Sequence, residues 1–383
     1  MLSLPSQVAQ KIRYQLILSV SMFLLCVATN TSAAVQQSLT IPLSLEYNSN
    51  PRLSTSNGQS VDRVILVPDY SITSSQGSNQ WFAQASLRLE QTSDQTISQN
   101  RNDPSLNLGW THDYETGQFG INALVDSQST RVSEFADSGL VSEDNTRNTR
   151  RLSLNWLNNL SERTSLTLNG IATNVTFDDL ATTGLVNYRN ELVNARFSYD
   201  LSEQVVTFTQ LSFSRYKPQG LTGVNSEIKS ADIGLTWNVN EKFNMTTSAG
   251  INEIKSEGSI QGIGRWQAML NMQYTTLLTN SHLSLSKNYI PGSTGIINET
   301  NQITAGWTYS LSDKENLVVD ISWYQNLTLN ETVTKSLAAN YTRQISLSWG
   351  FRLSAVYRNR NDNLTTASSN SIMTSIIYNL PDF

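Results

Sequence analysis

The sequence predicts an all-β fold, a transmembrane antiparallel up-and-down β-barrel of about 18 strands. Three observations predict it. Apolar residues recur with period two along most of the chain, the segments with this pattern run about 10 to 14 residues, and the connections between them alternate between short and long. A helix would repeat near 3.6 residues, and strands of globular sheets usually have only about five or six residues.

Residues 1–34 are predicted to be a cleaved signal peptide. Lys11 and Arg13 precede an apolar run from Leu16 to Ala28, and small residues follow just before position 35. Residues 35–383 are then expected to form a single barrel domain. Cys26 is the only cysteine and lies inside the apolar run, so the mature chain would carry no disulfide.

Composition excludes several other classes. With 38% hydrophobic and 15% charged residues, the chain is too polar for a helical membrane bundle and too poor in charge for a typical cytosolic enzyme. After the signal no run approaches the length of about 18 apolar residues that a membrane helix needs, so any membrane crossing must use strands. The net charge is −5 and no basic cluster is present, so no nucleic-acid partner is expected.

The alternation is clearest in segments 81–90, 231–239, 317–324 and 347–358. In the last of these, Leu347, Trp349, Phe351 and Leu353 are each followed by a residue of the other set, and only Val356 breaks the rule. Side chains on a strand point alternately to its two faces, so one face is apolar and the other polar.

Two kinds of connection separate the strands. The short kind comprises 115–118, 158–163, 201–204, 240–242, 277–280, 311–316 and 342–344; the long kind comprises 49–60, 92–103, 131–145, 179–184, 217–225, 256–261, 290–298, 327–333 and 360–370. Short turns on one rim and long loops on the other are typical of bacterial outer-membrane barrels.

An even strand number places both termini on the short-turn side, the periplasm. Pro42 and Pro68 weaken the first hairpin, so the alternative is about 16 strands.

An aromatic residue stands just before each short turn. If alternate strands descend to the same rim, these rings lie at one height and form an interfacial belt. The belt comprises Trp110, Trp156, Tyr199, Trp237, Tyr274, Trp307 and Tyr341.

The polar register supplies charged residues of both signs for the inner wall. At about 16 to 18 strands the interior is too wide for side chains to fill, so a water-filled lumen is expected. The lumen-lining candidates are Arg88, Glu90, Arg151, Arg196, Asp232, Asp320, Arg352 and Arg358. The preferred interpretation of these charged residues is that they pair with one another across strands in a wall that faces water. The alternative is a selectivity ladder or a sugar-binding track.

No catalytic, metal or cofactor site is predicted. His112 and His282 are the only histidines, and both lie beside short turns, where a barrel hydrolase would not place its machinery; His112 also shares the register of Trp110 and is expected to face lipid. Acidic residues of the long loops, including Asp137, Glu143 and Asp144, are expected to be solvated.

The chain ends at Phe383, and a terminal aromatic is the signal that barrel-assembly machinery reads. Segments 45–53 (LEYNSNPRL) and 64–68 (VILVP), with an aromatic strand end before each short turn, resemble outer-membrane β-barrels of the porin type associated with exopolysaccharide production and export. The resemblance implies an outer-membrane channel or secretion accessory and no catalytic residue.

The expected function is a non-enzymatic channel that assists export of polysaccharide or passage of hydrophilic solutes. A general diffusion porin and a non-conducting anchor of an envelope assembly are the alternatives. Expected partners are outer-membrane lipids and lipopolysaccharide, the assembly machinery, polysaccharide and periplasmic export components.

Overall fold

The computed structural model describes residues 34–380 except 56–57, 139–143, 181–183, 221–222, 259–261, 329–330 and 363–364. The signal peptide and Phe383 lie outside these residues, so both stay predictions. The first strands are β1 (Ala34–Asn48), β2 (Val61–Leu66), β3 (Asp69–Gln76), β4 (Asn79–Thr92), β5 (Arg101–Tyr114), β6 (Gly117–Ser129), β7 (Thr146–Ser161), β8 (Thr164–Phe177) and β9 (Asn187–Asp200). Helix α2 (Thr130–Ser138) lies between β6 and β7.

The second half of the wall continues without a helix among the described residues. It comprises β10 (Val205–Gln219), β11 (Ser226–Asn240), β12 (Phe243–Ser256), β13 (Ile263–Thr275), β14 (Thr279–Pro291), β15 (Ile297–Ser312), β16 (Glu315–Asn326), β17 (Thr332–Gln344), β18 (Trp349–Asn361) and β19 (Thr366–Leu380). Within the described residues, no helix has the length and apolarity needed to cross a membrane.

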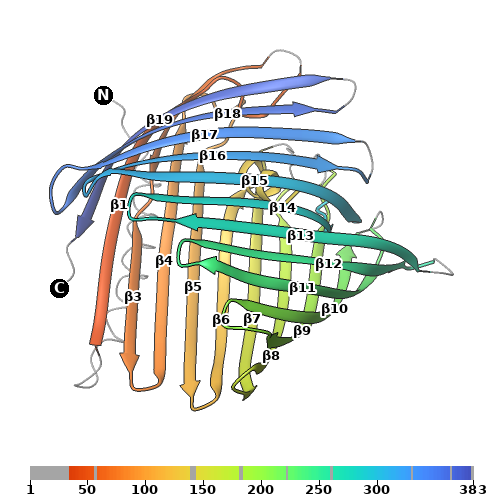
Figure 1. Cartoon of the computed structure of the whole chain (residues 1–383). Helices are drawn as coiled ribbons and strands as arrows, with labels where there is room; N and C mark the ends of the chain where they lie inside the picture. Colours follow the sequence, from red (N-terminus) through yellow and green to blue (C-terminus); the bar gives the residue numbers. More distant parts are fainter. Residues whose placement is uncertain are drawn as a thin grey trace.

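The strands form one closed antiparallel sheet (Figure 1). Strands pair along the chain in an up-and-down order, and β1 closes the cylinder against β19, from Leu39 opposite Leu380 to Asn48 opposite Ser371. Closure satisfies the backbone groups that an open edge would leave unpaired. The predicted all-β barrel is therefore confirmed.

The predicted number of 18 strands is also confirmed, because β2 and β3 occupy one position between β1 and β4, so that the 19 strands of the sheet make 18 wall positions. Pro68 causes this interruption, since proline has no N–H to donate to the ladder. The neighbouring backbone compensates: Val67 N–H donates to the Pro42 carbonyl (3.1 Å) and Leu87 N–H donates to the Pro68 carbonyl (3.1 Å).

Most uninterrupted strands have the expected length of about 10 to 14 residues, with 12 in β16 the shortest. Six are longer, up to 16 residues in β7 and β15. Several strands extend farther into the long connections than the turn-forming residues suggested. For example, β5 begins at Arg101 and contains Pro104. Ala34 of β1 pairs with Ser75 of β3, beside the short turn 77–78, and Leu380 of β19 pairs with Leu39. The described ends of the wall therefore both lie on the short-turn side.

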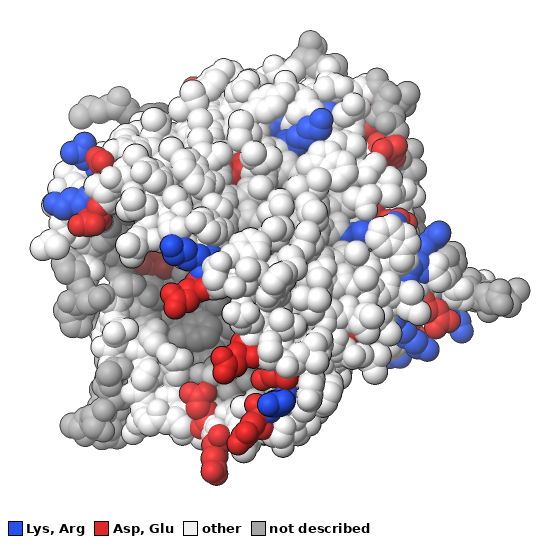
Figure 2. Space-filling model, viewed as in Figure 1, with Lys and Arg blue, Asp and Glu red and all other residues white. Residues whose placement is uncertain are grey.

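The two faces of the wall differ in chemistry. Large apolar side chains stand exposed on the outer face, with Ile233 and Ile251 each 69% exposed. Figure 2 shows the same distribution, with few charges over the middle of the visible face and most of the blue and red atoms toward its margins. So much exposed apolar surface requires an apolar environment around the cylinder.

Candidate functional site

All eight lumen-lining candidates lie on the inner face of the wall, and their role in lining a water-filled lumen stays a prediction. Arg88 and Glu90 bond to each other (2.8 Å), Arg196 stacks on the Phe208 ring (3.6 Å to its centroid), and Asp232 accepts from Gln267 (2.6 Å). The remaining positions follow from the ladders: Arg151 shares the face of buried Arg147, Asp320 lies opposite Gly306, and Arg352 and Arg358 lie opposite Ser375 and Ser369. The structure brings Arg88, Glu90 and Arg358 toward one site and leaves the other five elsewhere in the wall.

The predicted aromatic belt residues lie on the outer face near the short-turn end. Trp110 packs against Trp81 at 5.6 Å between ring centroids, and Trp237, Tyr274 and Trp307 are each exposed. His112 lies on this face, 6.0 Å from Trp110, whereas His282 lies opposite Gly306 on the inner face. The role of the belt at a membrane interface stays a prediction.

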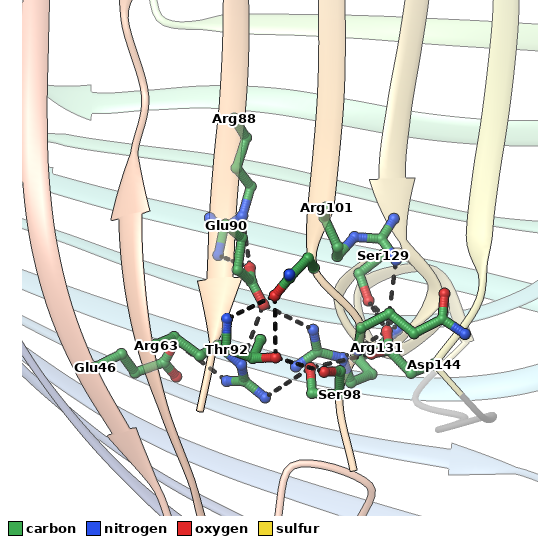
Figure 3. A network of polar contacts seen from close by, with 12 residues as sticks. Glu46, Arg63, Arg88, Glu90, Thr92, Ser98, Arg101, Ser129, Arg131 and Asp144 are labelled. Atoms are coloured by element: carbon green, nitrogen blue, oxygen red, sulfur yellow. Dashed lines mark hydrogen bonds and ion pairs between the residues drawn. The ribbon is translucent and has the colours of Figure 1, made fainter. Parts of the chain in front are cut away.

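A chain of buried ion pairs occupies the inner face near the long-loop end (Figure 3). We call it the mouth network; it comprises Glu46, Arg63, Glu90, Arg101, Asp103, Arg131 and Asp144. The successive N–O distances are 3.2 Å for Arg63–Glu46, 3.1 Å for Arg63–Glu90, 3.2 Å for Arg131–Glu90, 2.9 Å for Arg131–Asp144, 3.5 Å for Arg101–Asp144 and 2.9 Å for Arg101–Asp103. The side chains of Arg63, Glu90, Arg131 and Asp144 are at most 8% exposed.

Asp144 is the centre of this network. Besides Arg131 and Arg101, its carboxylate accepts from the Ser98 hydroxyl (3.1 Å), the Gln99 backbone N–H (3.0 Å) and the Ser129 hydroxyl (3.0 Å). The expectation that Asp144 is a solvated loop charge is therefore wrong, because two stretches of chain, 98–101 and 129–131, converge on it. Glu143 and the side chain of Asp137 lie outside the part of the chain that the structure describes.

The Asp144 carboxyl is held ionised by these partners. Burial raises its pKa, but the Arg131 guanidinium, the Gln99 N–H and Arg101 together lower that pKa below the ordinary value for aspartate. A buried carboxylate with so many donors is costly to leave unpaired, so the network and the segments that supply it form together.

Helix α2 is fixed inside the mouth by this network. Thr130 and Asn145 join the two ends of the connection: the Thr130 N–H donates to the Asn145 carbonyl (3.0 Å), and the Asn145 N–H donates to the Thr130 side-chain hydroxyl (3.0 Å). Arg131 then reaches Glu90 of β4, and Glu134 reaches Arg147 of β7 (3.6 Å). A helix was not expected in the long loop 131–145.

The helix also meets the opposite side of the barrel. Ser293, in the connection between β14 and β15, donates a hydrogen bond to Glu134 of α2. The same connection accepts from Tyr216 of β10 through the Gly292 carbonyl (2.6 Å) and from Val186 N–H through the Ser293 carbonyl (2.7 Å). Contacts therefore cross the mouth from β6 and β7 to β14 and β15.

An apolar cluster fills the sector beside this crossing. It comprises Val175, Phe177, Leu185, Tyr188 and Tyr216, and Ile297 packs against it. Charged residues line the other sector, because Arg63, Arg88 and Glu90 lie there and Arg358 of β18 interacts electrostatically with Glu46. The mouth thus has one packed sector and one charged sector.

The alternation identified Glu90 and Arg358 but missed most of their partners. Arg63 and Arg101 lie near the long loops, where the alternating stretches of sequence are shortest. Arg131 lies in a helix. Among the described residues, no group of three or more His, Cys, Asp and Glu is placed to hold a metal ion.

Comparison with known proteins gives likeness of fold alone. No protein-family model matches the sequence, and no curated protein matches it. The structure is similar to OccAB4 of Acinetobacter baumannii, with a TM-score of 0.51, 9% identity, and coverage of 91% of this chain and 98% of that one. It is similar to the outer membrane protein OpdK of Pseudomonas aeruginosa (TM-score 0.50, 9% identity, 91% and 99% coverage) and to OpdK with vanillate (TM-score 0.51, 9% identity, 91% and 99% coverage).

Proposed function

We propose that this protein is an outer-membrane channel that passes small hydrophilic solutes through a barrel narrowed at its long-loop end. The observation that carries the proposal is the buried mouth network, which holds α2 inside a cylinder whose outer face is apolar. Ions and polar side chains are stable on the inner face only if water or partners reach them. An aqueous lumen with a fixed constriction accounts for both faces.

The alternation of short and long connections supports a membrane orientation as part of this proposal. The long connections would face the exterior and the short turns, with both termini, would face the periplasm. This orientation requires export through the 1–34 signal and insertion by assembly machinery that reads Phe383. The proposal includes no enzymatic step, since the two histidines lie on opposite faces of the wall.

The two candidate solutes, small hydrophilic molecules and polysaccharide, differ in size. The crossing of the mouth by α2 and the connection 292–296 favours small molecules, whereas the resemblance in segments 45–53 and 64–68 favours polysaccharide. A dedicated polysaccharide conduit would leak little small sugar, and an anchor would leak none.

Swelling of liposomes that contain the refolded protein tests the proposal. We expect fast swelling in a monosaccharide, slower swelling in a disaccharide and little in a trisaccharide, with protein-free liposomes as the control. No swelling with any of the sugars would contradict the channel and would favour the export accessory or the anchor.

A further inference from the structure

The barrel wall is split at the long-loop end between β13 and β14. Their ladder runs from Thr275 opposite Asn280 only as far as Ala268 opposite Lys287. Beyond this point β13 continues to pair with β12 up to Ile263, and β14 continues to pair with β15 up to Pro291. The facing edges of the two strands therefore diverge, and part of the backbone at those edges has no ladder partner, which is costly within hydrocarbon.

The outer face changes from apolar to charged at the height of this split. On β11 and β12, Ile233 and Ile251 stand exposed toward the middle of the wall, while Lys229 and Glu253 lie opposite each other in the ladder nearer the rim. On β14, Leu285 is followed on the same face by Lys287. In Figure 2 the charged atoms at the right-hand margin lie where Figure 1 places the long-loop ends of these strands. In a membrane, such a boundary corresponds to the level of the lipid head groups.

A cavity of about 710 Å³ lies on the outer wall at this boundary. Its lining includes the apolar side chains of Leu211, Ile251 and Trp266, all more than half exposed. Two cations of the outer face line it, Lys229 and Lys287, together with two carboxylates, Glu253 and Glu299. Arg265 also borders it, but from the inner register of β13, where it lies opposite Asn252. We call it the outer-wall cavity.

Lys287 is held in place within the cavity. Its ammonium lies 2.6 Å from a Glu299 carboxylate oxygen and 4.4 Å from the centre of the Trp266 ring, and it is largely covered. Lys229 is exposed at the cavity. The site thus combines one fixed cation, one accessible cation and an adjacent apolar surface.

We propose that the outer-wall cavity binds a phosphorylated glycolipid of the outer leaflet. An acyl chain lies along Leu211, Ile251 and Trp266, and a lipid phosphate meets Lys229 and Lys287. Cations at this level attract anionic head groups, and phosphate oxygens can also accept from the unpaired backbone N–H groups at the split. The bound lipid fills the gap that the diverging strands leave open toward hydrocarbon.

The cavity faces the surroundings of the barrel and not its interior, so a lipid reaches it without passing the lumen. The inference rests on the membrane location proposed above. It makes no use of the mouth network or of conduction, so lipid binding and conduction can be measured separately on the same material.

Native mass spectrometry of the detergent-solubilised full barrel tests the proposal. The protein is titrated with bisphosphorylated lipid A and, separately, with the same lipid lacking both phosphates. The test variant is Lys229→Gln with Lys287→Gln, and Lys229→Gln alone is a milder variant at an exposed position. Lys335→Gln is the matched control, because Lys335 is an exposed residue opposite Trp323 on β16 and β17, away from the cavity.

We expect the double variant to bind the phosphorylated lipid about tenfold more weakly than the natural protein, with Lys229→Gln intermediate and Lys335→Gln unchanged. The lipid without phosphates is expected to bind as weakly to the natural protein as the phosphorylated lipid does to the double variant. Equal binding of both lipids, as expected for a site that takes only an acyl chain, overturns the proposal. An equal loss in Lys335→Gln also overturns it. Bilayer conductance of the same samples reports the channel independently.

Discussion

The Arg131 guanidinium lies 2.9 Å from Asp144, although the two residues stand at opposite ends of the connection between β6 and β7. Arg131 is in the first turn of α2, and Asp144 directly precedes the residues that lead into β7. Their contact closes the connection on itself and, through Glu90, fixes it to β4. Asp144 and its partners therefore hold the first turn of α2 in the mouth, while Glu134 holds the next turn through Arg147 and Ser293.

Replacing Asp144 is expected to release the helix. Asp144→Ala leaves Arg131 and Arg101 buried beside a missing carboxylate, which costs about 3–5 kcal/mol. We expect a larger single-channel conductance and faster proteolytic cleavage between residues 130 and 145, measured in planar bilayers and on intact liposomes. Asp178→Ala is the control, since Asp178 is an exposed acid in the next long connection. Identical behaviour of the two variants would show that the network does not position α2.

Acid is expected to have the same effect as this substitution. The pKa of Asp144 is lower in the folded protein than the value of about 3.9 for a free side chain. Its stabilising contribution is therefore complete above about pH 4 and is lost as the pH falls through the lowered pKa. Protease susceptibility of the 130–145 connection should rise below about pH 4 in the natural protein. In Asp144→Asn the susceptibility should already be raised at neutral pH and should change little with acid; an unchanged acid response in this variant would assign the effect to another group.

Gly250 of β12 is expected to tolerate no side chain. A Cβ at this position would lie 2.3 Å from the Ala231 carbonyl oxygen and 2.2 Å from the Asp232 carboxylate. Gly250→Ala should lower the stability of the barrel by about 1–3 kcal/mol, seen as a lower temperature for loss of the compact band on a gel. Gly170→Ala is the matched control, because nothing lies within 4 Å of its Cβ position. Equal midpoints for the two variants would contradict the packing described at β11 and β12.

Local alternation predicts the wall well because the sequence of each strand shows by itself which of its two faces is apolar. The inner positions of Arg196, Asp232 and Asp320 follow from their immediate neighbours, and so does the count of 18 strands. Pro68 interrupts a strand without removing it, since Val67 and Leu87 find carbonyl partners on either side. A sequence pattern identifies a proline but not the partners that replace its missing hydrogen bond.

The mouth network could not be predicted in the same way. Arg131 reaches Glu90 and Asp144 only after the sheet has closed and the connection has folded inward, so no spacing in the sequence reports these contacts. The sequence around Asp144 has the composition of a solvated loop. The burial of Asp144 depends on Ser98, Arg101 and Ser129, which come from other segments. The split between β13 and β14 likewise depends on ladder register that the alternation leaves unspecified.

The central claim is that the apolar face of the wall contacts lipid and the polar face contacts water. Since Cys26 lies in the predicted signal, single cysteines can be placed at Ile321, on the outer face, and at Ser322, on the inner face of the same strand. In intact liposomes a water-soluble thiol reagent should modify Ser322→Cys and reduce its conductance, while Ile321→Cys should react only after detergent is added. Equal modification of both positions without detergent would contradict the claim.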